Sequence, residues 1–230
     1  MLAELRAEVL AANLALVEQG LVRLTWGNAS GIDRKLGLVV IKPSGVPYES
    51  MDGDSLVVVD LQGQVIEGSH RPSTDTPTHL ALYRGLGELG GVVHTHSTWA
   101  TAWAQAQRAI PVLGTTHADL CPDPVPVTRA LTPQEVAGDY ETATGAVVLE
   151  AMAGASLAEV PAVLVRGHGP FTFGGDPAAA VVAAVTLEVV AETALLTQLL
   201  DPGGPPLPPF LAQRHFSRKH GAGAYYGQPR

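Results

Sequence analysis

The sequence predicts an α/β fold in which helices cover a central sheet. Two patterns alternate along the chain: apolar residues at helical spacing in some segments, and short valine-rich extended runs in others. Glycine, proline and aspartate separate these segments, as they do in turns. A length of 230 residues fits one large domain, so residues 1–230 are expected to fold around a single core.

The first third of the chain begins with a helix and continues with extended segments. Residues 2–19 place apolar side chains at helical spacing with charged ones on the other side, and Gly20 is a typical helix stop. Four short extended runs follow, separated by turn residues, and they are expected to be strands: 21–26, 36–45, 55–60 and 64–70.

The rest of the chain mixes helices with two strands that each lead to a histidine. Pro77 near the first turn of a helix over 76–87, and Thr132-Pro133 before Glu135, are typical helix starts. The other expected elements are helices at 98–107, 143–153, 177–200 and 210–219, strands at 91–96 and 161–169, and a loop at 114–124. Residues 201–210, DPGGPPLPPF, are interpreted as a stiff connector because they can form neither helix nor central strand.

Composition excludes several classes of protein. The formal net charge is −8, whereas a nucleic-acid-binding protein needs a basic surface. No run approaches the ~18 apolar residues that a membrane helix requires, and the charged start lacks a signal peptide's uninterrupted apolar stretch. Cys121 is the single cysteine, so no intramolecular disulfide can form. We therefore expect a cytoplasmic protein that binds neither nucleic acid nor a membrane.

Two histidines at the end of a strand-like run indicate a metal site. In GVVHTHSTW, His94 and His96 lie two residues apart, so an extended backbone turns both imidazoles to one side. The simpler alternative is that both are loop histidines without a function, and this short motif does not decide between a metal site and that alternative. His168, in RGHG, follows the apolar run PAVLV at the end of another strand. Three such histidines are typical of a catalytic site for a divalent transition ion.

Short polar loops indicate where an anionic group could bind. KPSG at 42–45 and RPSTDTPTH at 71–79 place hydroxyl residues beside glycine or proline after an extended run, and WGNAS at 26–30 has a similar character. Hydroxyls and free backbone N–H groups in such turns can hold a phosphate. An ordinary hydroxyl-rich turn has the same composition, so each loop alone leaves both interpretations open.

Seven segments of the chain form a combination that is highly specific, although each alone is not. They are LTWGNAS, VIKPSGV, PSTDTPTH, VVHTHSTWAT, GTTHAD, RGHGPF and RKHGAGAYYGQ. In this order they resemble the L-ribulose-5-phosphate 4-epimerases, within the class II sugar-phosphate aldolase/epimerase superfamily, over essentially the whole chain. The resemblance implies a three-layer α/β domain with a mostly antiparallel central sheet, the class II aldolase-like fold. It also implies C4 epimerisation of L-ribulose 5-phosphate to D-xylulose 5-phosphate, as in L-arabinose catabolism.

The resemblance implies a metal site and a substrate site. One divalent ion per subunit, typically Zn²⁺ with Mn²⁺ or Co²⁺ as alternatives, would be held by His94, His96 and His168, with Asp75 beside them. From the residues alone, Asp75 could instead cap the helix over 76–87, or serve both roles. The family usually has Ser-Ser where this chain has Ser73-Thr74, and both pairs carry hydroxyls. The substrate-binding residues implied by the match are Gly27, Asn28, Lys42, Ser44, Gly45, Ser73, Thr74, Thr116, Glu141 and His215.

Three of the matching residues carry a further alternative or no assigned role. Lys42 could add charge to the phosphate pocket or merely cover a surface. His117 and Arg218 fall in matching segments and are expected to line the site without an assignable role. Cys121, two residues from Asp119, is interpreted as a small apolar filler because a nucleophile would need an activating base.

The resemblance also implies the mechanism. The inverted carbon has no acidic hydrogen, so the C3–C4 bond breaks and re-forms on the other face of the rotated glycolaldehyde phosphate, with the metal ion as Lewis acid. Asp119 and Tyr226 match the two proton-transfer residues, one for each configuration of the C4 hydroxyl. Without the resemblance, Asp119 would be interpreted as a loop carboxylate and Tyr226 as part of a frayed end.

Two other functions fit parts of the pattern. L-fuculose-phosphate aldolases of the same superfamily cleave and release their products, and they usually carry Glu where this chain has Asp75; the YYGQ ending also favours the epimerase. A non-catalytic module such as the adducin head lacks the metal histidines. The epimerase family forms a homotetramer with active sites between subunits, so the tail, about 220–230, is expected to complete an active site that takes a small sugar phosphate.

Overall fold

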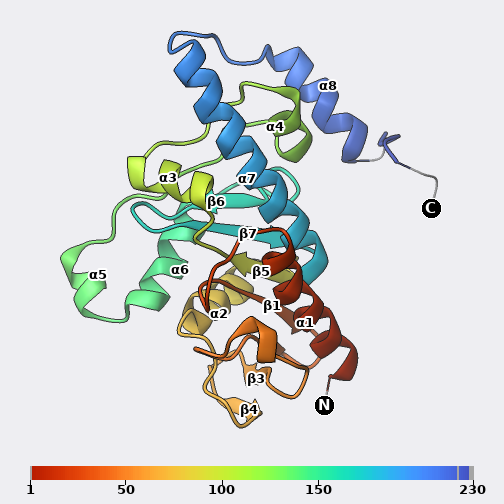
Figure 1. Cartoon of the computed structure of the whole chain (residues 1–230), viewed down its shortest axis with the longest axis vertical. Helices are drawn as coiled ribbons and strands as arrows, with labels where there is room; N and C mark the ends of the chain where they lie inside the picture. Colours follow the sequence, from red (N-terminus) through yellow and green to blue (C-terminus); the bar gives the residue numbers. More distant parts are fainter. Residues whose placement is uncertain (1, 222, 228–230) are drawn as a thin grey trace.

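The architecture is a single antiparallel sheet with helices on both sides, as Figure 1 shows for the computed structural model, which describes residues 2–221 and 223–227. Seven strands follow one another across the sheet in the order β4-β3-β2-β1-β5-β7-β6, and every neighbouring pair is antiparallel. The strands are β1 (Asn28–Asp33), β2 (Leu38–Ile41), β3 (Val57–Asp60), β4 (Val65–Glu67), β5 (Gly91–His94), β6 (Ala162–Leu164) and β7 (Pro170–Gly174).

The helices alternate with these strands along the chain. A short 3₁₀ helix, Tyr48–Ser50, follows β2. The α-helices are α1 (Ala3–Glu18), α2 (Thr76–Gly85), α3 (Thr98–Ala106), α4 (Thr115–Leu120), α5 (Pro133–Ala137), α6 (Tyr140–Ala151), α7 (Pro177–Leu200) and α8 (Pro209–Lys219).

Alternating valines divide the core between the two faces of the sheet. Val59 and Val92 pack with the residues of α2 and α6, whereas their chain neighbours Val58 and Val93 pack with α1 and α7. This follows from the strand period of two, which sends successive side chains to opposite faces. Each buried valine contributes about 1.5–3 kcal/mol relative to an exposed one. The three-layer α/β prediction is therefore confirmed, and the sheet is antiparallel throughout.

One predicted strand does not form, and one observed strand was not predicted. Residues 21–26 form no strand: Leu24 has a φ of 55° and is 74% exposed, and Trp26 is 57% exposed. The strand lies just beyond, in NASGID (β1), whose glycine, asparagine and serine disfavour strands locally. β1 forms because β2 and β5 pair with it on both sides. The strand β7 was also not predicted, although PFTFG contains two phenylalanines.

Helix boundaries follow their caps. Thr132 forms the expected capping box with Glu135, and Asp176 caps α7 by accepting from the N–H of Ala179. Asp139 accepts from the N–H of Thr142, so α6 begins three residues before the predicted 143. The predicted loop 114–124 contains α4, whose six residues are too few to show helical periodicity. Asp75 precedes α2 but makes no side-chain cap bond, so the capping alternative for Asp75 is wrong.

The helix α7 is more apolar than expected. Its 24 residues are long and apolar enough to cross a membrane by length and composition, which corrects the expectation that no such run exists. One side of α7 is buried against the sheet, α1 and α3. Glu188, on α7, accepts hydrogen bonds from the N–H groups of Trp99 and Ala100 at the start of α3. The packing and these contacts of Glu188 place α7 against the protein core.

The connector and last helix end against α4. Leu207 donates its N–H to the carbonyl of Val112, and α8 then packs along α4 at the end of the molecule opposite β3 and β4 (Figure 1). The chain then turns back, because the N–H groups of Tyr225 and Tyr226 both donate to the carbonyl of Arg218. Residues 222 and 228–230 of the predicted tail lie outside the described residues.

Candidate active site

Three histidines from two distant segments meet at one point. The Nε2 atom of His96 lies 3.2 Å from Nε2 of His94 and 3.2 Å from Nε2 of His168. The three nitrogen atoms lie within 4.8 Å of one another. β5 ends at His94, and His168 lies in the turn that joins β6 to β7, four residues beyond the end of β6 rather than at it. The pairing of β5 with β7 brings the two segments together.

The orientation of the rings fits a bound cation. Nδ1 of His94 lies 2.9 Å from the carbonyl oxygen of Pro170, which can only accept, so Nδ1 carries the proton and Nε2 keeps its lone pair. Nδ1 of His168 lies 2.9 Å from the hydroxyl of Tyr140. Lone pairs directed at one point repel one another unless a cation lies between them. The donor set is therefore suited to a divalent transition ion, and the three histidines could hold a metal ion.

Burial favours the neutral, metal-binding form of two of these imidazoles, His96 and His168. The pKa of His168 is lowered to about 4, first by burial and then by the neighbouring His94 and His96 rings. Burial, followed by the proximity of His94, also lowers the pKa of His96. Neutral imidazole is the metal-binding form, so the rings are ready for a cation at neutral pH.

The surroundings of β5 hold the first two histidines rigidly. The ring of His94 is 1% exposed and stacks on the ring of Phe171 with centroids 4.2 Å apart. α3 begins two residues after His96, and the carboxylate of Glu188 binds its first N–H groups. The strand on one side and the capped helix on the other therefore fix the short His94–His96 segment.

The predicted phosphate-binding loops lie side by side next to this cluster. The N–H of Ser44 donates to the carbonyl of Arg71, and the N–H of Ser73 donates to the carbonyl of Lys42. Together with WGN of residues 26–28 they enclose a cavity of about 430 Å³, which we call the histidine cavity. Its lining includes nine of the predicted site residues: Gly27, Asn28, Lys42, Ser44, Gly45, Ser73, Thr74, Asp75 and His96.

Asp75 points into the histidine cavity and is held there by Asn28. The amide nitrogen of Asn28 donates to Asp75 Oδ2 at 2.6 Å and to Ser73 Oγ at 3.2 Å. Burial acts to raise the pKa of Asp75, but His94, His79 and the Asn28 amide outweigh it, so that pKa is lowered. Asp75 is thus a carboxylate at neutral pH. The buried Oδ1 of Asn28 has no hydrogen-bond partner among the described residues, which leaves an acceptor for a ligand in the cavity.

Lys42 is a buried cation rather than a surface cover. Its side chain is 2% exposed, and Nζ lies 3.2–3.4 Å from the carbonyl oxygens of Thr25, Pro43 and Val46. Nζ also lies 4.7 Å from the centre of the Tyr48 ring. Burial lowers the pKa of Lys42, while the charge of Asp75 acts in the other direction. The alternative that Lys42 merely covers a surface is therefore wrong.

Gly27 lies where a side chain would not fit. Its φ is +77°, and a Cβ atom there would come within 2.7 Å of Val22 Cγ1 and 3.0 Å of the carbonyl oxygen of His94. The hydroxyl of Tyr48 donates to the carbonyls of Gly27 and Trp26 and secures this loop. The loop can therefore pass directly over the end of β5 only with glycine at this position.

Asp119 and Tyr226 lie together, but apart from the histidine cavity. Asp119 accepts from Arg218 at 2.5 and 2.9 Å and from His215 at 3.1 Å, and the guanidinium of Arg218 lies 5.1 Å from the centre of the Tyr226 ring. Tyr226 is 64% exposed. We call Asp119, His215, Arg218, Lys219 and Tyr226 the Asp119 cluster. Within residues 2–221 and 223–227, none of them lines the histidine cavity.

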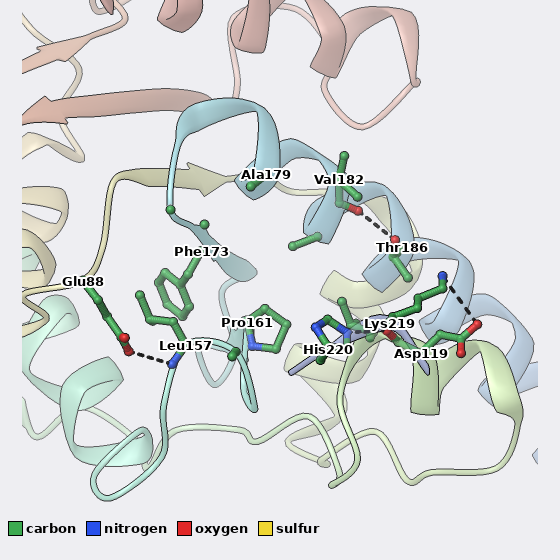
Figure 2. Close-up of a pocket in the computed structure, with 15 residues that line it drawn as sticks. Glu88, Asp119, Leu157, Pro161, Phe173, Ala179, Val182, Thr186, Lys219 and His220 are labelled. Atoms are coloured by element: carbon green, nitrogen blue, oxygen red, sulfur yellow. Dashed lines mark hydrogen bonds and ion pairs between the residues drawn. The ribbon is translucent and has the colours of Figure 1, made fainter. Parts of the chain in front are cut away.

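The Asp119 cluster borders a different hollow. Figure 2 shows Asp119, Lys219 and His220 at one end of a cavity of about 460 Å³, with Val182 and Thr186 of α7 along its side and Pro161 and Phe173 at its base. Burial acts to raise the pKa of Asp119, but hydrogen bonds from Arg218 and His215 and the charge of Lys219 lower it overall. Asp119 is therefore ionised at neutral pH, and it lines this second cavity.

Three other predicted residues are not gathered at the histidine cavity. Thr116 is exposed on α4, and His117 is buried with Nε2 3.1 Å from the carbonyl oxygen of Asp123, so the expectation that His117 lines the site is wrong for the described chain. The backbone carbonyl of Glu141 accepts from the hydroxyl of Thr78. Cys121 is 1% exposed within an apolar cluster, and burial raises the pKa of its thiol to about 12, as expected for a filler.

The sequence patterns did not reveal four residues that shape the site. Tyr140 contacts His168, Glu188 caps α3, Tyr48 secures the Gly27 loop, and Trp26 stands exposed on the wall of the histidine cavity. Each acts on a residue far away in the sequence, so no local spacing reports it. For Trp26, its position inside WGNAS was the one available signal.

Comparisons with known proteins agree with this geometry. Residues 7–195 match the family model "Class II Aldolase and Adducin N-terminal domain". The chain is 54% identical to proteins named L-ribulose-5-phosphate 4-epimerase UlaF from Salmonella paratyphi A and Salmonella typhi, covering 98% of this chain and 99% of each relative.

Solved structures give the same result for the fold. An L-fuculose 1-phosphate aldolase matches with a TM-score of 0.78 and 25% identity, covering 94% of this chain and 97% of the aldolase. The L-fuculose 1-phosphate aldolase from Glaciozyma antarctica PI12 matches with a TM-score of 0.76 at 20% identity, covering 96% of this chain and 84% of its own. The fold, the histidine cluster and these matches agree, and the chain belongs to the class II aldolase and adducin N-terminal domain family.

Proposed function

We propose that this protein catalyses the epimerisation of L-ribulose 5-phosphate to D-xylulose 5-phosphate at C4. The observation that carries the proposal is the histidine cavity, where His96 and Asp75 line the same space as the hydroxyl-bearing loops 42–45 and 73–74. A sugar phosphate needs both a charge-stabilising centre and a phosphate subsite. The 54% identity to proteins named L-ribulose-5-phosphate 4-epimerase over nearly the full chain supports this substrate.

In this proposal one Zn²⁺ per subunit, with Mn²⁺ or Co²⁺ as alternatives, is held by His94, His96 and His168 with Asp75 beside them. The ion supplies Lewis acidity toward the ketone and its neighbouring hydroxyl oxygen. The fixed proton on Nδ1 of His94 supports this assignment, because it leaves Nε2 free. The lowered pKa of Asp75 supports a role for this residue as a carboxylate, either as a ligand or as a base.

The loops around the cavity bind the phosphate in this proposal. Ser44, Gly45, Ser73 and Thr74 offer hydroxyl and backbone N–H donors to the anion. Lys42 adds a cation whose position three carbonyl oxygens fix. Gly27 and Asn28 complete the wall, and Asn28 also holds Asp75.

Asp119 and Tyr226 are the proton-transfer residues in this proposal, each serving one configuration of the C4 hydroxyl. His215 and Arg218 hold the Asp119 carboxylate, and Thr116 lies on the same helix, α4. Glu141 lies in the first turn of α6, next to the His168 partner Tyr140. Because the Asp119 cluster lies outside its own chain's histidine cavity, at least one member acts on the metal site of another subunit.

A homotetramer with active sites between subunits is part of the proposal. An exposed stripe on α7 supports an assembly, because Val182, Val189 and Leu196 recur every seven residues and are 65, 45 and 44% exposed. Between them, Thr186 and Thr193 donate their hydroxyls to carbonyls one turn earlier, so this face presents methyl groups. Sustained spacing of this kind suits helix packing against another surface.

The domain and its cellular setting complete the proposal. Residues 1–230 act as one domain whose tail completes an active site, in a cytoplasmic protein without nucleic-acid or membrane partners. The buried, unpaired Cys121 is consistent with a reducing compartment. A place in L-arabinose catabolism stays a prediction, since any route that delivers L-ribulose 5-phosphate could use the same epimerisation.

The deciding experiment is product analysis. The purified protein, loaded with Zn²⁺ or Mn²⁺, is incubated with L-ribulose 5-phosphate, and the mixture is analysed for D-xylulose 5-phosphate and for free dihydroxyacetone and glycolaldehyde phosphate. Epimer without free fragments is the expected result. Fragments without epimer would instead identify a class II aldolase, the second candidate, which is favoured by the fold match to L-fuculose 1-phosphate aldolase. Neither product from the metal-loaded protein would refute the epimerase proposal.

A further inference from the structure

The hydroxyl of Tyr140 contacts Nδ1 of His168, one of the three clustered histidines. Tyr140 is the first residue of α6, and the cap at Asp139 fixes the start of this helix. Its hydroxyl oxygen lies 2.9 Å from Nδ1 of His168, and the two rings are nearly parallel, with an interplanar angle of 7° and centroids 6.3 Å apart. Tyr140 thus contacts the ring atom of His168 that faces away from the other two histidines.

The position of the proton on His168 follows from its two neighbours. Nε2 lies 3.2 Å from Nε2 of His96, inside the cluster, and must carry a lone pair to bind a cation. The proton of the neutral ring is then on Nδ1, which donates to the hydroxyl oxygen of Tyr140. Any weakening of this hydrogen bond frees the ring to take the other tautomer, in which a proton occupies the metal-binding nitrogen.

The three histidines differ in how they are held. His94 donates to the carbonyl of Pro170, a main-chain group fixed by the β6–β7 pairing. His168 lies in the turn between Gly167 and Gly169, and among the described residues its ring has only side-chain hydrogen-bond partners, His96 and Tyr140. For His168, the hydroxyl of Tyr140 on α6 therefore provides the hydrogen bond to Nδ1 that the main-chain carbonyl of Pro170 provides for His94.

We propose that Tyr140 is a positioning residue that fixes His168 in the tautomer offering Nε2 and thereby raises the affinity of the site for a divalent ion. The proposal rests on the proposed function only in taking the three histidines as metal ligands. Outer partners of metal-bound histidines commonly contribute about 10–100-fold in metal affinity.

The variant Tyr140→Phe keeps the ring and removes only the hydroxyl. Metal-free protein is titrated with Zn²⁺ against a chromogenic chelator, and separately with Co²⁺ while its visible absorption is recorded. We expect the Zn²⁺ Kd of Tyr140→Phe to rise about 10–100-fold and its Co²⁺ spectrum to differ from that of the wild type. The control is Tyr83→Phe, because the hydroxyl of Tyr83 is also buried and hydrogen-bonded, 2.9 Å from Ser30 Oγ, but contacts no histidine of the cluster. This control should lose stability and keep the wild-type Kd.

Equal Zn²⁺ affinity in Tyr140→Phe and the wild type would overturn the proposal, as would an equal loss in Tyr83→Phe. A crystal structure of the Zn²⁺-loaded wild type provides a second measurement if Tyr140→Phe does not fold. The hydroxyl of Tyr140 should stay within hydrogen-bond distance of Nδ1, and a separation beyond about 3.5 Å would overturn the proposal. Neither readout uses epimerase activity, so a wild type that binds Zn²⁺ but forms no epimer would refute only the proposed function.

Discussion

The histidine cavity and the Asp119 cluster are built in opposite ways. His94 and Asn28 sit on paired strands and are 1 and 2% exposed, and main-chain hydrogen bonds join the loops around them. The Asp119 cluster is held by side-chain ion pairs at the end of the molecule, where α4 meets α8. The first region is positioned by the sheet, and the second by a few charged contacts on a surface.

This difference fits the proposal that the active site is shared between subunits. Positions in a sheet are fixed by many cooperative main-chain bonds, so ligands with strict geometry, such as metal-binding imidazoles, belong there. Ion pairs between partly exposed groups contribute about 0–1 kcal/mol each, so the Asp119 cluster is poorly held unless a neighbouring surface packs against it. The two regions should therefore respond differently to mutation, mixing and pH.

Removing one ligand of the histidine cavity should have the largest effect. His96 is exposed at the cluster, so His96→Ala should fold normally and lose its metal ion. Turnover should fall by at least about 10³-fold, since a Lewis acid supplies several kcal/mol of charge stabilisation. Metal analysis of the purified variant and a thermal unfolding curve check both parts. Full metal content would refute the assignment of His96.

Removing the tyrosine hydroxyl of the Asp119 cluster should lower turnover but leave the metal site intact. Tyr226→Phe should lose about 10²–10⁴-fold in turnover, the usual contribution of a proton-transfer group, with unchanged Zn²⁺ content. Truncation after Gly223 should do the same with little loss of stability, because the tail buries little surface.

A mixing experiment then tests the separation of the two regions. His96→Ala and Tyr226→Phe, each inactive alone, should regain part of the activity when their subunits are exchanged in one assembly. Recovery requires that a metal site of one chain meet a tyrosine of another. Absence of recovery in demonstrated mixed assemblies would place Tyr226 in its own chain's site, and a fully active monomer would contradict the assembly.

A smaller effect is expected from lengthening the carboxylate in the histidine cavity. Asp75→Glu should shift the balance from epimer toward released aldol fragments, because the extra methylene brings the carboxylate nearer the bound substrate. A change of about 1 kcal/mol in the partition corresponds to roughly fivefold in the product ratio. Quantifying epimer and dihydroxyacetone from the same reaction, for the variant and the wild type, checks this. An unchanged ratio would argue against a role for carboxylate length.

The smallest expected effect is the loss, at acid pH, of the stability that the Asp119 carboxylate contributes. The pKa of Asp119 is lowered in the folded chain, so its contribution is complete above the unfolded value of about 3.9 and is lost as the pH falls through the folded value. Protection of the α8 amides from hydrogen exchange, corrected for the intrinsic exchange rate at each pH, should fall as the pH drops below about 4, by no more than about 1 kcal/mol. Asp119→Asn should already exchange faster at pH 6 and show little further change. Equal pH dependence in both proteins would exclude Asp119 as the cause.

Local sequence patterns predicted much of the fold. Runs of consecutive valines in 55–60 and 91–93 and the helical spacing of α1 predicted two core strands and the first helix, because both patterns reflect local backbone preference. The capping box at Thr132 and the cap at Asp176 are equally local. The predictions failed at β1 and at residues 21–26, where the pairing of distant strands outweighs intrinsic preference.

The sequence, through its resemblance to the epimerase family, also indicated nine of the residues that line the histidine cavity, whereas composition and spacing alone left the role of each polar loop open. Only the tertiary structure decided how they are held: that Asp75 bonds to Asn28 instead of capping α2, that Lys42 is buried, and that Tyr140 reaches His168. It also decided that Arg218 contacts both Asp119 and Tyr226, away from the histidines of their own chain. Most of these contacts join residues 28–99 positions apart or depend on burial, and neither distance in space nor exclusion of water is encoded in local spacing.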